Sequence, residues 1–182
     1  MFTGGPLSPP DLFLKLVIIV DRKADVVNPA ALQRFARRAQ AMARVKGDVA
    51  VLITSRRKVQ ALNRRFRNKD KATDVLSFPS HQGGDIAVCF EIARQNAARL
   101  GHSVTDEIKV LVLHGMLHLA GYDHETDSGQ MARAEARLRA RLKLPASLIQ
   151  RSEPGATVAS PSRRRSLATR KKGLSRPGGK TS

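Results

Sequence analysis

The segment from residue 106 to residue 120 constrains the fold more than any other part of this chain, because it has almost no polar face. It predicts a helix with large apolar residues all round its axis: Ile108, Val110, Leu111, Val112, Leu113, Met116, Leu117 and Leu119. A helix of this kind belongs in the interior of a domain. The other elements must therefore pack around it.

Four short segments rich in Val, Ile and Leu, each bounded by turn or charged residues, predict strands at 14–20, 48–54, 74–78 and 85–89. Further helices are expected at 29–44, 91–100 and 128–142, and one more begins after Ser55 and carries Val59, Leu62 and Phe66 inward. Gly83 and Gly84 are expected to form a turn before the last strand. The predicted fold class is α+β, with a small mixed four-stranded sheet packed with about five helices.

Composition limits this architecture to one folded domain. With 182 residues of which 41% are hydrophobic, the core is too small to divide in two. Residues 1–11 are expected to be a disordered leader, 12–150 the domain and 151–182 a basic disordered tail with almost no large apolar residue. The tail is either a solubilising extension or an arm that contacts RNA.

The charge of the chain indicates its class of partner. The net charge is +18, and the tail, with nine basic residues against Glu153, carries +8 of it, so +10 remains on the rest. A protein this basic attracts polyanions, of which nucleic acid is the expected one. No membrane partner is expected, because the sequence lacks an amphipathic anchor and the apolar run ending at Val20 is too short to span a bilayer. The single cysteine, Cys89, fits a reducing compartment, and cytoplasm is the expected location.

Three histidines lie at the end of the buried helix. His114 and His118 are four residues apart and so project from one helical face, at a separation that one metal ion can bridge. Gly121 can take the left-handed conformation that ends a helix, after which the chain can return His124 towards them. Three imidazoles leave one position of a tetrahedral zinc open, which is typical of a catalytic site. We expect one Zn²⁺ per chain, although imidazole also binds nickel, copper, cobalt and iron.

The same histidine spacing is found in metzincin proteases, which makes peptide hydrolysis a competing hypothesis. Those enzymes use a glutamate directly after the first histidine as general base, and this chain has Gly115 there. Asp123, beside His124, could replace that base after folding or could instead orient a histidine. The histidine spacing therefore fits a hydrolase, but the sequence does not identify the residue that accepts the proton.

Two long motifs resemble the YbeY family of endoribonucleases. They are HGMLHLAGYDH at 114–124 and LNRRFRNKDKATDVLSFP at 62–79, followed by GDI at 84–86, and the resemblance spans about residues 14–145. It implies a single-strand-specific, zinc-dependent endoribonuclease that matures the 3′ end of 16S ribosomal RNA and acts in ribosome quality control. It further implies His114, His118 and His124 as zinc ligands, with His114 and Arg67 in catalysis. Precursor ribosomal RNA and the small subunit with its assembly factors are the implied partners. Ala72 departs from the proline usual in the family.

A guanidinium suits the role that the resemblance gives Arg67, because it can donate two parallel hydrogen bonds to a phosphate. Two alternatives remain beside RNA cleavage: a ribosome-assembly factor whose zinc mainly holds the fold, and, less favoured, a metalloprotease. Whether water or the RNA 2′-hydroxyl attacks the phosphorus also stays open.

Overall fold

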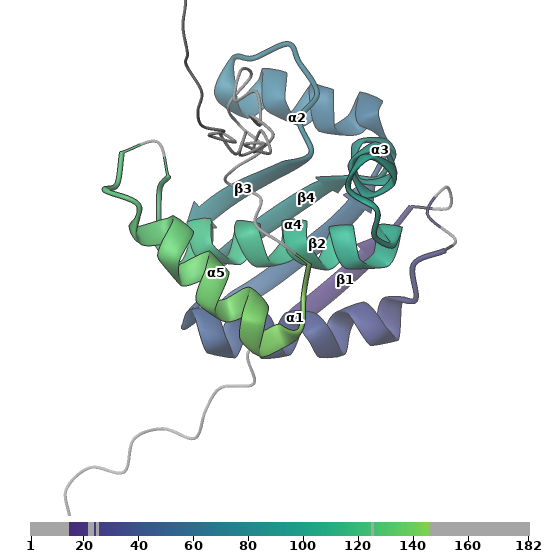
Figure 1. The fold of residues 1–182 in the computed structure, drawn as a ribbon. Coiled ribbons are helices and arrows are strands. Elements are labelled where there is room, and N and C mark those ends of the chain that lie inside the picture. The colour runs from purple at the N-terminus through teal and green to yellow at the C-terminus, as the bar shows by residue number, and fades with distance from the viewer. Residues whose placement is uncertain (1–14, 22–23, 25, 125, 146–182) are drawn as a thin grey trace, which may run out of the picture. The chain divides into compact units, whose positions relative to one another are not determined.

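The computed structural model describes residues 15–145 except 22, 23, 25 and 125, so the expected leader and tail lie outside the described residues. The described part forms a four-stranded sheet with five helices (Figure 1), as predicted. In chain order the elements are β1 (Leu16–Val20), α1 (Pro29–Ala43), β2 (Asp48–Thr54), α2 (Arg56–Arg67), β3 (Val75–Ser80), β4 (Gly83–Cys89), α3 (Phe90–Leu100), α4 (Val104–Leu119) and α5 (Gln130–Leu142).

The sheet is mixed, with strand order β1-β2-β4-β3. The first three of these strands are mutually parallel, and β3 runs antiparallel to β4 at the edge. Helical crossovers can join parallel neighbours, whereas the short turn from β3 to β4 allows only an antiparallel pair. The expected turn at Gly83 and Gly84 is wrong, because both residues begin β4, with Gly83 paired to Asp48 of β2. A Cβ on Gly83 would collide with the Asp48 backbone, so this close pairing needs glycine.

Helix α4 is the centre of the main core, as its apolar sequence predicts. Every residue from Val110 to Leu117 is buried, and α1, α3, α5, β3 and β4 all pack against the helix (Figure 1). Ile86 and Val88 of β4 face this core, while Ala87 and Cys89 face a second cluster under α2. Since alternate residues of a strand point to opposite faces, α2 covers the sheet face opposite to α4. None of the described helices is long and apolar enough to cross a membrane.

Gly115 allows α4 to lie close to the sheet. A Cβ at this position would come within 2.8 Å of Ile86 Cγ2 and 3.0 Å of Ser77 Oγ, distances at which atoms must shift. The Ser77 hydroxyl also donates to the Gly115 carbonyl at 3.4 Å. Glycine therefore has a packing role here, beside the first histidine, because a larger residue would require the Ile86 and Ser77 side chains to shift.

Helix α2 departs from the sequence expectation in two ways. Ser55 occupies the N-cap position, but its side chain makes no capping hydrogen bond, and Glu91 instead accepts from the Arg56 backbone N–H at 2.9 Å. Val59 is buried as predicted, whereas Phe66 is 57% exposed. Phe66 lies in the last turn and packs on Phe78 of the edge strand β3, so the sheet covers only part of its ring.

Candidate metal centre

The three predicted histidines converge. His114 and His118 project from the last turns of α4, and Gly121, with φ +89°, lets the chain reverse so that His124 returns to them. Their candidate ligand atoms all lie within 4.8 Å of one another, and their ring centroids are 4.8–5.3 Å apart. This geometry confirms the cluster that spacing along the sequence predicts.

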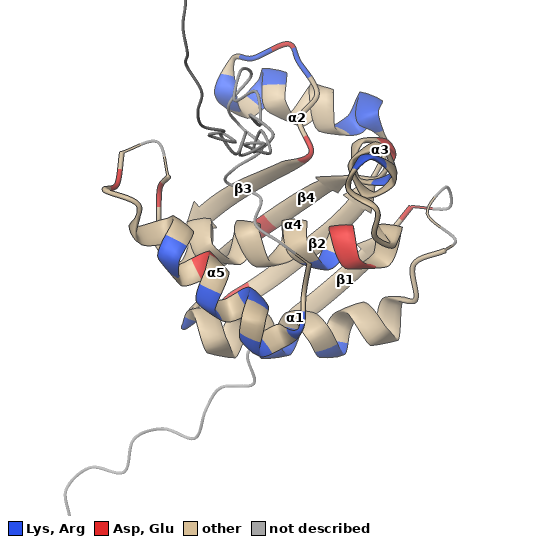
Figure 2. Cartoon of the chain, viewed as in Figure 1, with Lys and Arg blue, Asp and Glu red and all other residues tan. Residues whose placement is uncertain are grey.

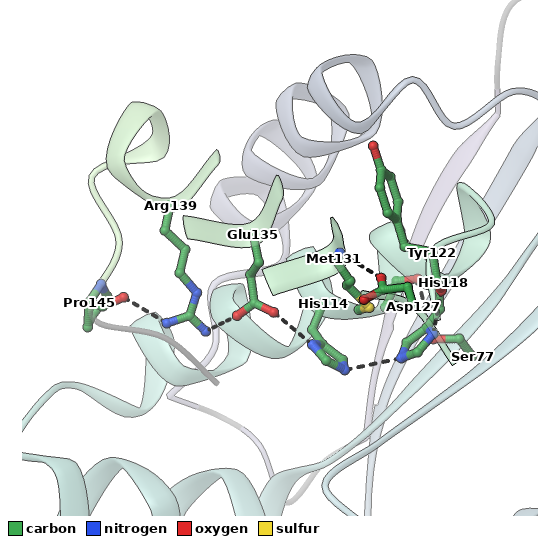
Figure 3. Close-up of polar contacts among 10 residues, drawn as sticks. Ser77, His114, His118, Tyr122, Asp127, Met131, Glu135, Arg139 and Pro145 are labelled. Carbon is green, nitrogen blue, oxygen red and sulfur yellow. Dashed lines mark hydrogen bonds and ion pairs between the residues drawn. The ribbon is translucent and has the colours of Figure 1, made fainter. Parts of the chain in front are cut away.

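Hydrogen bonds at Nδ1 orient the first two rings (Figure 3). His114 Nδ1 lies 3.0 Å from Glu135 Oε2, and His118 Nδ1 lies 3.0 Å from the Tyr122 carbonyl oxygen. A carbonyl and an ionised carboxylate only accept hydrogen bonds, so both Nδ1 atoms donate and the two Nε2 atoms point toward each other. The two Nε2 atoms are 3.2 Å apart, a contact that is attractive only if a proton or a metal cation lies between them. A metal cation bound by both atoms meets this requirement.

The remaining features of the cluster also fit a metal ion. His124 Nδ1 is buried and has no hydrogen-bond partner among the described residues, a state that is costly for a polar atom unless something binds it. Burial, and then the neighbouring His114 and His124, lower the pKa of His118 to about 4. The ring is therefore neutral at neutral pH, as a ligand must be. The donor set suits zinc and other metals that bind imidazole.

A buried ion pair supports His114 from α5 (Figure 3). Glu135 is fully buried and, besides facing His114, pairs through Oε1 with Arg139 Nη2 at 2.6 Å. Arg139 Nη1 donates to the Pro145 carbonyl at 2.9 Å, beyond the end of the helix. Sequence reasoning missed both residues. The sequence does contain a signal for them, because an acidic and a basic residue lie four positions apart on the buried face of an amphipathic helix. Charged residues that are buried in this way usually form an ion pair.

The histidines open onto a polar cavity of about 500 Å³. Arg67, at the end of α2, lines the same cavity, and its Nη2 donates to the Ser77 carbonyl of β3 at 2.9 Å. Figure 2 shows further basic residues along α2 and in the loop after it. The complete lining is Asn63, Arg67, Lys69, Lys71, Ala72, Thr73, Asp74, Val75, Leu76, Ser77, His114, His118, Asp123 and His124.

Other candidates have structural roles or lie elsewhere. His81 is exposed in the turn between β3 and β4, and His102 pairs with Glu107 at 2.7 Å, so neither joins the cluster. Asp127 accepts from backbone N–H groups at the start of α5 and acts as its cap. Asp123, by contrast, lines the cavity, and its Oδ2 accepts from the Thr126 hydroxyl at 3.0 Å.

An α+β domain in which three histidines and an arginine face one polar cavity has the site of a metal-dependent hydrolase. A family model described as endoribonuclease YbeY matches residues 19–143. Endoribonuclease YbeY of Koribacter versatilis is 49% identical over 152 residues, covering 82% of this chain and 100% of that protein. Its counterpart in Solibacter usitatus is 50% identical over 123 residues, covering 66% of this chain and 84% of that protein. A solution structure from Thermotoga maritima is similar, with TM-score 0.50, 26% identity, and coverage of 78% of this chain and 99% of that one.

The chain belongs to the endoribonuclease YbeY family, since the family model covers more than half of it. As a member it is a metal-dependent endoribonuclease. The family resemblance recognised in the two sequence motifs is confirmed.

Proposed function

We propose that this protein hydrolyses phosphodiester bonds of single-stranded RNA with one zinc ion held by His114, His118 and His124. The observation that carries the proposal is the convergence of these three rings with Arg67 on one polar cavity. A zinc ion bound there would supply a Lewis acid for the phosphoryl oxygen and lower the pKa of a bound water. The net charge of +18 favours attraction of a polyanionic substrate to the protein.

Arg67 is proposed to bind the reacting phosphate. One of its N–H groups holds the Ser77 carbonyl at 2.9 Å, which fixes the guanidinium at the cavity wall. A guanidinium has five N–H donors, so others can bind two phosphate oxygens and stabilise the charge that develops on them. His114 acts through the metal, with its ring oriented by Glu135.

The proposed physiological substrate is precursor ribosomal RNA, with cleavage at the 3′ end of 16S RNA and a further part in ribosome quality control. The proposed partners are the small ribosomal subunit and its assembly factors, in the cytoplasm. Support comes from membership of the YbeY family and from the basic charge of the chain.

The test is cleavage of a precursor 16S RNA by purified protein whose zinc content has been measured. The variant His114→Ala should lose both zinc and cleavage. The variant His81→Ala is the matched control, because it removes an exposed histidine outside the cluster, and it should cleave at the rate of the unmodified protein. Unchanged cleavage by His114→Ala would refute the metal mechanism.

A second candidate is a ribosome-assembly factor in which the metal mainly holds the fold. The presence of Gly115 directly after the first histidine favours it, because glycine cannot act as the base that metzincin proteases of similar spacing use, and its contacts with the Ile86 and Ser77 side chains give it a packing role. The discriminating variant is Arg67→Gln, with Arg94→Gln on the exposed side of α3 as control. If folded, zinc-loaded Arg67→Gln supports rRNA processing as well as the control does, the structural role is favoured over cleavage. The same absence of a glutamate disfavours a metalloprotease.

A further inference from the structure

An exposed aromatic ring stands at the end of α2, outside the metal centre. Phe66 is 57% exposed, although phenylalanine stabilises a fold chiefly when its ring is buried. Its ring is held by Phe78 of β3, with centroids 5.2 Å apart and planes inclined at 62°, an edge-to-face contact. The ring is thus supported on one side and presented to solvent on another.

One arginine side chain lies over this ring. The Arg65 Cζ is 5.2 Å from the ring centroid, while Arg64, two residues before Phe66 on the same helix, has its Nη1 4.0 Å from Asp70 Oδ1. A guanidinium is planar, so it can stack on a nucleobase, and its charge attracts phosphate. Proteins that hold single-stranded nucleic acid combine these two components, an aromatic ring for the base and cations for the backbone.

Both phenylalanines are next in sequence to residues that line the cavity, although neither ring is itself part of the lining. Phe66 directly precedes Arg67 on α2, and Phe78 directly follows Ser77 on β3. The hydrogen bond from Arg67 to the Ser77 carbonyl and the contact between the two phenyl rings therefore lie next to each other between the same two elements. Arg67 and Ser77 line the cavity that holds the histidines. A nucleotide whose phosphate reaches Arg67 can thus place a neighbouring base near Phe66.

We propose that Phe66, supported by Phe78 and flanked by Arg65, is a stacking platform for one unpaired nucleobase next to the phosphodiester that is cut. This rests on the RNA cleavage proposed above and adds a subsite to it. Every base has a π face, so the platform accepts any base. In a duplex both faces of a base are covered by its neighbours, so only an unpaired or splayed-out base can stack on Phe66. The platform therefore selects single-stranded RNA.

Fluorescence can test the platform without cleavage. The chain contains no tryptophan, so Phe66→Trp introduces a single indole at the platform. Ile19→Trp is the matched control, because Ile19 is 52% exposed on the edge strand β1, away from the cavity lining. An unstructured oligodeoxynucleotide should quench the indole fluorescence of Phe66→Trp and leave that of the control unchanged, whereas its duplex and an abasic oligonucleotide should not quench. Equal quenching by the abasic strand, or none by any strand, would overturn the platform.

Cleavage supplies the second test. Phe66→Leu keeps an apolar side chain but removes the π face, and it should raise KM for single-stranded RNA so that kcat/KM falls about 5- to 100-fold. Phe66→Tyr keeps the ring and should stay within about threefold of the unmodified protein. Zinc content should be unchanged in both. If Phe66→Leu cleaves as the unmodified protein does, the platform is refuted while RNA cleavage stands; if the unmodified protein cuts no RNA, the proposed function fails instead.

Discussion

The contact between Glu135 and His114 makes a quantitative prediction about metal affinity. In Glu135→Gln the side chain keeps its shape, but one carboxylate oxygen becomes an NH₂ group. The native carboxylate faces two donors, His114 Nδ1 at 3.0 Å and Arg139 Nη2 at 2.6 Å. An amide offers only one acceptor oxygen, so one of these donors would then face another donor. The variant therefore weakens either the orientation of the ligand or the buried ion pair.

Two magnitudes follow from this geometry. Loss of the carboxylate that orients a ligating histidine lowers metal affinity about 10- to 100-fold, which corresponds to about 1.4–2.8 kcal/mol. Breaking a fully buried ion pair destabilises the fold by about 3–5 kcal/mol. A domain in the middle of the usual range of about 5–15 kcal/mol stays folded after that loss, and zinc affinity is measured on variant protein whose fold has been checked by circular dichroism.

Arg139→Met separates the two effects. It removes the ion pair at 2.6 Å but leaves the carboxylate facing His114. We expect both variants to lose stability in urea unfolding of the metal-free protein, and only Glu135→Gln to lose the full 10- to 100-fold in zinc affinity, measured by competition with a chromophoric chelator. Arg137→Gln, on the exposed side of the same helix, is the control and should change neither quantity by much.

The chelator competition can refute this reasoning in two ways. Zinc affinity of Glu135→Gln within twofold of the unmodified protein would mean that the carboxylate does not orient His114. Equal losses of affinity in Glu135→Gln and Arg139→Met would mean that the pair acts on the metal only through the stability of the fold.

Two further predictions concern residues beside the cavity. Gly115→Ala places a methyl group 2.8–3.0 Å from side-chain atoms of Ile86 and Ser77. We expect the free energy of unfolding, measured with urea, to fall by about 1–3 kcal/mol. An unchanged urea midpoint would show that these side chains adjust without cost. Asp123→Asn is expected to lower RNA cleavage about 10²- to 10⁴-fold at unchanged zinc content, as for a general base, since Asp123 lines the cavity; a parallel loss of zinc would assign it to ligand orientation.

Most of the architecture follows from patterns that are local in the sequence. The all-apolar segment around Leu113 predicts the buried α4, and short β-branched runs predict the four strands, with boundaries that differ by a few residues. The histidines could be grouped because helix periodicity places His114 and His118 on one face and a glycine turn returns His124. Selecting Arg67 among neighbouring arginines depended on the family resemblance. Its contact with Ser77 shows how α2 and β3 hold it at the cavity.

The remaining features depend on distances between elements that the sequence does not encode locally. Periodicity places Phe66 on the inner face of α2, but only the tertiary structure shows that this turn meets the edge strand, where little covers the ring. Likewise, Glu135 reaches His114 because α5 packs beside α4, and no spacing in the chain predicts that contact. The sequence by itself determined the elements, most of their buried faces and the three-histidine cluster, since these follow from local periodicity. Packing decided which side chains orient those histidines and which aromatic ring remains exposed on α2.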